Sequence, residues 1–237
     1  MDHIHTIPVL DALREPNNCA FCTMMNKLES DAIQFIMGPA YMEDDIRMET
    51  NKIGFCKRHM DAMYKHQNRL GLALMLHTHL QQLNKDAGNI INGRIPAPLF
   101  GKDPNGAATK LKNHLLATHS TCYVCNKVEN TAVKYIDTFF YLWGKGGEEA
   151  KLIESQKGYC LPHFTELMSK AEKLGRGKRE RILDHLLPMW QRFTQEMEED
   201  LDWFIQKFDY RNANASWKDS QDAIERSIVL LKGENHA

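Results

Sequence analysis

Six cysteines and two histidines of this chain form one pattern that occurs twice. In the first copy, Cys19-Ala-Phe-Cys22 is followed by Cys56-Lys-Arg-His59. In the second copy, Cys122-Tyr-Val-Cys125 is followed, after a nearly equal interval, by Cys160-Leu-Pro-His163. Cysteine thiolates and histidine nitrogens at these short spacings are typical ligands of zinc. The repetition therefore predicts two metal sites of the same kind.

We expect each metal to be bound within one copy of the pattern. Two thiolates three residues apart can reach the same ion, and the Cys-x-x-His pair that follows completes a tetrahedron. Such a shell leaves no position open for a substrate, as in structural zinc sites. The prediction is two Zn²⁺ per chain, one held by Cys19, Cys22, Cys56 and His59 and the other by Cys122, Cys125, Cys160 and His163.

Three other interpretations of the cysteines stay open. Single cysteines are often small buried apolar residues, although chance would then have to place six of them in the same order twice. The Cys-x-x-Cys pairs could be redox-active dithiols, but these usually open a helix after a strand, and no such strand is predicted. Thiolate-rich sites also hold iron–sulfur clusters, in which histidine sometimes replaces cysteine, and spacing alone does not separate them from zinc.

The duplicated pattern also predicts how the chain is organised. An internal duplication implies two similar helical halves, each held together by its own Cys3His site. The segment from Gly88 to Gly106 is rich in glycine and proline and is the best boundary between them. We expect a first repeat over residues 1–100, a second over 101–177, and C-terminal helices that pack on the repeats over 178–237.

Apolar residues recur at helical spacing through most of the sequence. Alternating runs of β-branched residues bounded by turns are lacking, so we expect an all-α fold. Glycine and proline mark the ends of several segments, as at Gly38-Pro39. The predicted helices span residues 20–37, 41–51, 56–85, 107–118, 122–143, 148–156, 161–174, 178–208 and 220–231, with Pro188 able to kink the long one.

Several stretches resemble an uncharacterised bacterial family, a domain of unknown function common in anaerobic Gram-positive bacteria. The resemblance lies in residues 38–47, 50–59 and 68–80, and in the tail from Phe204 to Arg211 with Trp217. It covers nearly the whole chain. It implies a helical protein with paired cysteine motifs and no established activity that could be transferred.

The charge balance argues against some classes of partner, although a nucleic-acid partner stays possible. Thirty Lys and Arg against thirty-one Asp and Glu give a net charge of -1. No overall field therefore attracts nucleic acid or an anionic membrane. No apolar run is long enough to span a bilayer, and no secretory signal is recognisable, so we expect a soluble cytoplasmic protein with reduced cysteines.

Three further groups of residues are also candidates for a functional role. Glu43, Asp44 and Asp45 could bind a cation but fit an acidic helix start better. His77 and His79 are two residues apart and cannot share a metal on one helix face, although one of them could line a pocket. A basic patch that favours a solvated surface over a nucleic-acid site comprises Lys170, Lys173, Arg176, Lys178, Arg179 and Arg181.

The sequence shows no nucleophile motif, phosphate-binding loop or dinucleotide fingerprint. It therefore offers no catalytic residues, and whether the protein is an enzyme stays open, with a non-catalytic role favoured. We expect two structural sites in a protein that binds an unidentified protein partner. A redox or metal-sensing protein with iron–sulfur clusters or labile zinc at the same residues is the alternative. The oligomeric state does not follow from the sequence.

Overall fold

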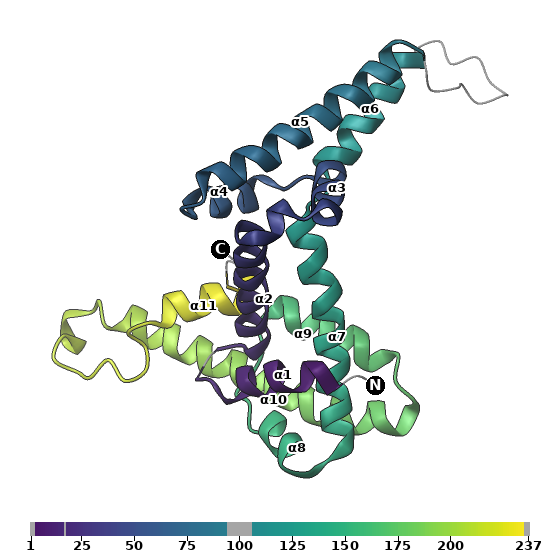
Figure 1. Ribbon diagram of the computed structural model, residues 1–237. Helices are drawn as coiled ribbons and strands as arrows, with labels where there is room; N and C mark the ends of the chain where they lie inside the picture. The colour runs from purple at the N-terminus through teal and green to yellow at the C-terminus, as the bar shows by residue number, and fades with distance from the viewer. Residues whose placement is uncertain (1–2, 17, 94–105, 235–237) are drawn as a thin grey trace. The chain divides into compact units, whose positions relative to one another are not determined.

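A computed structural model shows a chain built from helices (Figure 1). It describes residues 3–16, 18–93 and 106–234, and none of these residues forms a β-strand. The expected all-α fold is therefore confirmed. In chain order the elements are η1 (His3–His5), α1 (Thr6–Arg14), α2 (Ala20–Met37), η2 (Pro39–Met42), α3 (Asp44–Ile53), α4 (Lys57–Lys65), α5 (Arg69–Ile91), α6 (Gly106–His119), α7 (Tyr123–Lys145), α8 (Gly147–Glu154), α9 (Leu161–Glu172), α10 (Arg176–Gln206), η3 (Tyr210–Asn212) and α11 (Ala223–Lys232).

Most helix boundaries agree with the sequence pattern. The α2 helix has the predicted ends, because its apolar face is buried and Gly38-Pro39 follows it. The α10 helix continues through Pro188. Helix α1 was not predicted, although Val9, Ala12 and Leu13 stand at helical spacing and form its buried face. The predicted loop from Gly88 starts later than expected, since α5 continues to Ile91, and residues 94–105 of that loop lie outside the described part of the chain.

The single long helix predicted over residues 56–85 is wrong. The chain forms α4 and then, after a short break, α5. Asn68 causes the break, because its side-chain Oδ1 accepts the backbone N–H of Gly71 at 2.9 Å and thereby caps α5. Its Nδ2 also donates to the carbonyl oxygen of Met37 at 2.9 Å. Apolar residues stand at helical spacing both before and after Asn68, so the sequence pattern alone does not show the break.

Replacement of Asn68 tests how much this helix cap contributes to the stability of the protein. We expect Asn68→Ala to lower the free energy of unfolding by about 1–2 kcal/mol, because the first turn of α5 loses its acceptor and Met37 loses a donor. Urea denaturation followed by circular dichroism would measure the change. Asn113→Ala, at an exposed position inside α6, is the matched control and should change stability little. Equal effects of the two substitutions would contradict the capping role.

The helices form two compact units made of non-consecutive segments. Unit 1 contains residues 3–16, 18–27 and 131–234 of the described chain, and unit 2 contains residues 28–93 and 106–130. The boundaries fall inside α2 and α7, so each of these helices supplies residues to both units. This division differs from the three consecutive segments expected from the sequence, 1–100, 101–177 and 178–237.

Each unit has its own apolar core. In unit 1, the rings of Phe21, Phe139 and Tyr159 are fully buried and contact one another edge to face, with centroids 5.2–6.0 Å apart. In unit 2, one end of α2 and one end of α7 pack with the short helices and with α5, and Ile36, Met63 and Val124 are fully buried there. These cores include the residues that flank the cysteines.

Among the described residues, no helix has both the length and the apolar composition that crossing a bilayer requires.

Candidate metal centres

The eight predicted ligands gather into two groups, but the pairing differs from the prediction. The unit-1 cluster consists of Cys19, Cys22, Cys160 and His163, and the unit-2 cluster consists of Cys56, His59, Cys122 and Cys125. Within each cluster, all four ligand atoms lie within 4.8 Å of one another. The Cys-x-x-Cys pair of each sequence copy therefore meets the Cys-x-x-His pair of the other copy. The expectation that each copy forms its own site was wrong.

The length of α2 explains this exchange. Cys22 lies in its first turn, and an 18-residue helix extends for roughly 27 Å. The chain therefore leaves unit 1 along α2 before it reaches Cys56. Helix α7 has the same role in the second copy, because it begins next to Cys122 in unit 2 and ends in unit 1, where Cys160 follows.

The unit-1 cluster is entirely buried. Its histidine provides Nδ1, which lies 3.1 Å from Cys160 Sγ, 3.5 Å from Cys22 Sγ and 3.6 Å from Cys19 Sγ. The two sulfur atoms of Cys22 and Cys160 are 3.6 Å apart. All four ligand atoms therefore surround one small space.

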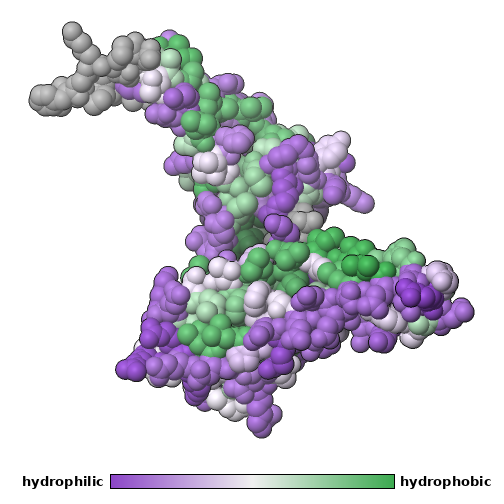
Figure 2. Space-filling view, turned by 180° about the vertical axis from the view of Figure 1, so that it is seen from behind, coloured by the Kyte–Doolittle hydropathy of each residue, from purple (hydrophilic) through white to green (hydrophobic). Residues whose placement is uncertain are grey.

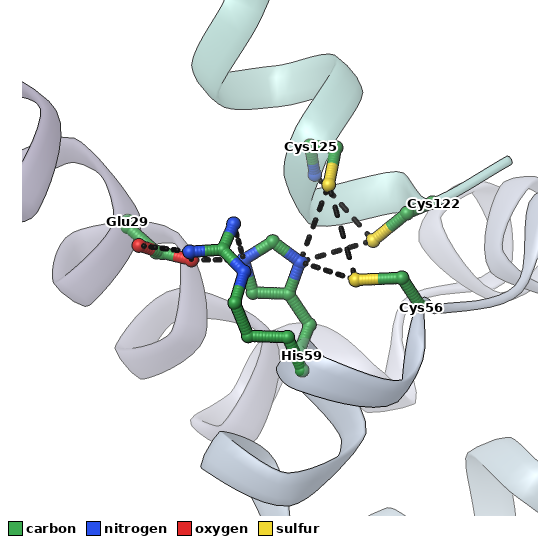
Figure 3. Close-up of polar contacts among 6 residues, drawn as sticks. Glu29, Cys56, His59, Cys122 and Cys125 are labelled. Carbon is green, nitrogen blue, oxygen red and sulfur yellow. Dashed lines mark hydrogen bonds and ion pairs between the residues drawn. The ribbon is translucent and has the colours of Figure 1, made fainter. Parts of the chain in front are cut away.

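The unit-2 cluster has the same arrangement (Figure 3). His59 again provides Nδ1, at 3.2 Å from Cys56 Sγ, 3.1 Å from Cys122 Sγ and 3.4 Å from Cys125 Sγ. The sulfur atoms of Cys56 and Cys125 are 4.0 Å apart. This cluster differs in exposure, because Cys56 and Cys125 are only half-buried.

The two Cys-x-x-His turns have the same backbone geometry. Cys56 and Cys160 are extended residues that each precede a helix, so the histidine three residues later lies in the first turn on the same side. A glycine stands two residues before each cysteine for a steric reason. Gly54 has φ 68° and lies against the His79 ring, and a Cβ on Gly158 would be 2.2 Å from the Phe193 ring.

The spacing of the ligand atoms fits one tetrahedral ion per cluster. Zn–S bonds of about 2.3 Å and Zn–N bonds of about 2.0 Å imply S···S separations of roughly 3.8 Å and S···N separations of roughly 3.5 Å. The observed sulfur pairs at 3.6 and 4.0 Å, and the sulfur–nitrogen pairs at 3.1–3.6 Å, are close to these values. Both groups could therefore bind a metal ion without rearrangement of the backbone.

Without a cation, four of the six clustered thiols resist ionisation. Burial raises the pKa of Cys19 to about 12, and its neighbour Cys160 adds to the effect. Burial also raises the pKa of Cys125 to about 12, together with the negative charge that Cys122 would carry. A divalent cation offsets the free energy needed to ionise these thiols, because its positive charge stabilises thiolates that otherwise repel one another. The chemistry of the donor set therefore favours a bound cation over free thiolates.

Glu29 is a part of the unit-2 site that the sequence analysis missed. Its carboxylate is 1% exposed and accepts a hydrogen bond from His59 Nε2, the ring nitrogen that faces away from the sulfurs (Figure 3). Arg58 Nη1 pairs with the same carboxylate at 2.8 Å. A carboxylate in this position fixes the tautomer of a metal-binding histidine and makes it a stronger ligand.

The protonation state of His59 is consistent with ligation. Burial lowers its pKa, although the hydrogen bond to Glu29 and the charge of that carboxylate act in the opposite direction. A neutral ring that donates Nε2–H to Glu29 presents its Nδ1 lone pair to the three sulfurs. One sequence signal was available for Glu29, since it lies four residues after Met25 on the buried face of α2, where an acid is unexpected.

The C-terminal end of α11 adjoins the unit-1 cluster, which the sequence also did not indicate. Gly233 ends the helix with φ 77°, and a Cβ there would lie 3.7 Å from both Cys22 Sγ and Cys160 Sγ. The next residue, Glu234, donates its backbone N–H to Cys22 Sγ at 3.4 Å. Such a bond favours the thiolate form of the cysteine.

The remaining candidates do not join either cluster. Glu43, Asp44 and Asp45 are exposed at the start of α3, as expected for an acidic first turn. His77 is exposed, and His79 donates from Nδ1 to the carbonyl oxygen of Asn51 at 2.8 Å. The basic patch is exposed or half-buried, and within it Arg176 pairs with Glu180 while Lys170 pairs with Asp137.

Exposure predicts which cysteines react first. In the metal-loaded protein, we expect iodoacetamide to modify Cys56 and Cys125 at least about tenfold faster than the other four, because only these two are half-buried. Peptide mapping by mass spectrometry at partial modification would give the order. Reaction of Cys19 or Cys160 at the same rate would contradict the burial of the unit-1 cluster.

A comparison with known proteins agrees with the resemblance noted in the sequence. The model of a family of unknown function, DUF6062, matches residues 1–237. The chain belongs to this family. No curated protein and no solved structure matches the chain. For this member of the DUF6062 family, function must therefore be argued from the two clusters themselves.

Proposed function

We propose that this protein binds two zinc ions as structural elements and acts by binding another protein, without catalysis, in the cytoplasm. The observation that carries the metal proposal is the closed shell of three sulfurs and one nitrogen in each cluster. Four protein ligands fill a tetrahedral zinc site and leave no position for substrate or water. Buried structural zinc of this kind supplies folding free energy.

The compactness of the clusters supports a single ion over an iron–sulfur cluster. The ligands of an iron–sulfur cluster bind different iron atoms and are therefore separated by the cluster itself. Here all four ligand atoms lie within 4.8 Å of one another. Zinc is favoured among single ions because it prefers tetrahedral sites of sulfur and nitrogen ligands.

Metal analysis tests this proposal. Protein purified without added metal should be colourless and contain about two zinc per chain by mass spectrometry, and a chelator strong enough to remove both ions should abolish most of the helical signal. Visible absorption together with iron and acid-labile sulfide would contradict it. So would chelated protein that keeps its helicity and thermal transition.

The exposure of the unit-2 cluster favours a second function, zinc release on oxidation. Cys56 Sγ and Cys125 Sγ are 4.0 Å apart and half-buried. Hydrogen peroxide could oxidise these two thiolates to one disulfide, with two protons taken up, two waters formed and Zn²⁺ released. A colorimetric zinc indicator should then detect one equivalent per chain, restored to the protein by a dithiol. Release of both ions together, or of neither, would exclude a sensor confined to unit 2.

A further inference from the structure

An apolar groove in unit 1 is not explained by the metal sites. It has a volume of about 500 Å³ and lies between α10 and α11, with Leu161 of α9 at one side. Its floor follows one face of α10 from Trp190 through Met197 to Ile205. Fifteen helical residues extend for roughly 22 Å, which is the length of a helix of about four turns. The groove is therefore long enough for one apolar face of a helix of this length to lie along it.

The apolar side chains at this groove are exposed to solvent. Ile205 is 67% exposed, Leu231 56% and Leu161 42%. On the adjoining face of α11, Ile224 and Ile228 are also exposed, and Figure 2 shows green, apolar atoms over α11. A monomer rarely exposes so many neighbouring aliphatic side chains unless they bind something.

The charge at the groove indicates the kind of partner. Glu198 and Asp202 line it, and no lysine, arginine or histidine is among its described lining residues. Five of the seven residues from Glu196 to Asp202 are acidic. The nearby Arg226 is paired with Asp200 at 2.9 Å and with Asp222 at 2.8 Å. A partner that carries lysine or arginine beside an apolar stripe complements this surface.

We propose that this groove binds an amphipathic helix of a partner protein, with leucine or isoleucine on one face and lysine or arginine on its flanks. A second copy of the chain fits less well. In a symmetric dimer through this face, the same acidic surface of both copies would be buried in one interface, with Glu198 and Asp202 contributed twice and no described cation in the groove to offset them. The same carboxylates would repel an anionic membrane surface.

The unit-1 cluster holds two walls of the groove. Leu161 directly follows the ligand Cys160, and α11 ends at Gly233, beside the sulfurs of Cys22 and Cys160. Loss of the metal should therefore remove the link between α9 and α11 and destroy the groove. This part of the inference rests on the proposed metal binding, whereas the groove and its charge do not.

A labelled peptide pair tests the groove. The probe is a fluorescein-labelled 18-residue helix with a leucine stripe and lysine flanks, and the control peptide has glutamate in place of lysine. Fluorescence anisotropy with the zinc-loaded chain should show binding of the lysine peptide at least about tenfold tighter than of the glutamate peptide, and weaker binding as salt is raised.

Two pairs of substitutions separate the apolar and the charged contributions. Ile205→Ser with Leu231→Ser should weaken binding at least about 30-fold, since both exposed side chains would be buried by the peptide. Glu198→Gln with Asp202→Asn should weaken it about five- to tenfold. The controls are Val133→Ser, an exposed aliphatic on α7, and Glu172→Gln with Asp184→Asn, exposed acids outside the groove, and they should change nothing.

Several outcomes would overturn the inference. Equal binding of the two peptides, or binding unaffected by the serine pair, would show that the groove is not the site. A dimer in light scattering that Ile205→Ser with Leu231→Ser dissociates would assign the groove to a second copy. Zinc content is measured on every sample. If the unsubstituted chain holds two zinc but does not bind the lysine peptide, the groove proposal is wrong, whereas weakened binding by the serine pair with two zinc present supports it. Absent zinc counts against the proposed metal sites.

Discussion

Two double variants should give opposite metal contents. Cys22→Ser with Cys160→Ser removes two ligands from the unit-1 cluster alone, so this protein should retain one zinc per chain. Cys22→Ser with Cys56→Ser removes one ligand from each cluster, so this protein should retain none after dialysis against a mild chelator. Serine is a poor zinc ligand, and the loss of one thiolate from a closed shell weakens binding by orders of magnitude.

The zinc contents of these two double variants also distinguish the observed pairing of ligands from the pairing that the sequence suggests. If each sequence copy formed its own site, Cys22→Ser with Cys160→Ser would lose both ions and Cys22→Ser with Cys56→Ser would keep one. The single variant Cys22→Ser, with one zinc under either pairing, is the control for correct folding of the other site. Elemental analysis gives the content, and circular dichroism shows whether the helices of the intact unit persist.

Removal of the Glu29 carboxylate should weaken zinc binding in unit 2 without affecting unit 1. We expect the affinity of the unit-2 cluster to fall about tenfold in Glu29→Gln, which keeps an acceptor for His59 Nε2–H, and about 100-fold in Glu29→Ala. Glu29→Ala also leaves a buried donor on His59 unpaired, at a cost of about 1–3 kcal/mol in the free energy of unfolding.

The measurement is cleanest in a protein with one site. In the Cys22→Ser, Cys160→Ser background, only the unit-2 cluster binds zinc, and competition with a fluorescent chelator gives its affinity directly. Glu43→Gln is the matched control, because Glu43 is an exposed acid in the same unit. An unchanged affinity in Glu29→Ala would show that this carboxylate does not orient His59.

The sequence identified the residues of the two clusters and most of the helices, but not which residues lie together in each cluster. Short-range spacing identifies Cys19 with Cys22, and Cys160 with His163, because three residues fix how two side chains lie on a turn. Which pair meets which depends on where α2 and α7 lead the chain, and this is a property of long-range packing. The duplicated pattern favoured the nearer partner in sequence, and the length of α2 decides against it.

The helix break at Asn68 and the role of Glu29 also depend on contacts between residues far apart in sequence, which local spacing does not predict. An asparagine between two apolar stretches becomes a cap only when the chain turns there. A single acid on the buried face of α2 acquires a meaning only once His59, thirty residues later, lies against it. Local sequence patterns predict helices and candidate metal ligands. Contacts between residues far apart in sequence become visible only in the three-dimensional structure.

The exchange of partners between the two copies also sets an order of events during translation. The ligands of unit 2 are complete as soon as Cys125 has left the ribosome, whereas Cys19 and Cys22 emerge early and must wait for Cys160 and His163. The nascent chain therefore carries Cys19 and Cys22 without their partners until His163 has been made. The unit-2 cluster can assemble first, and the unit-1 cluster can assemble only after synthesis has passed His163.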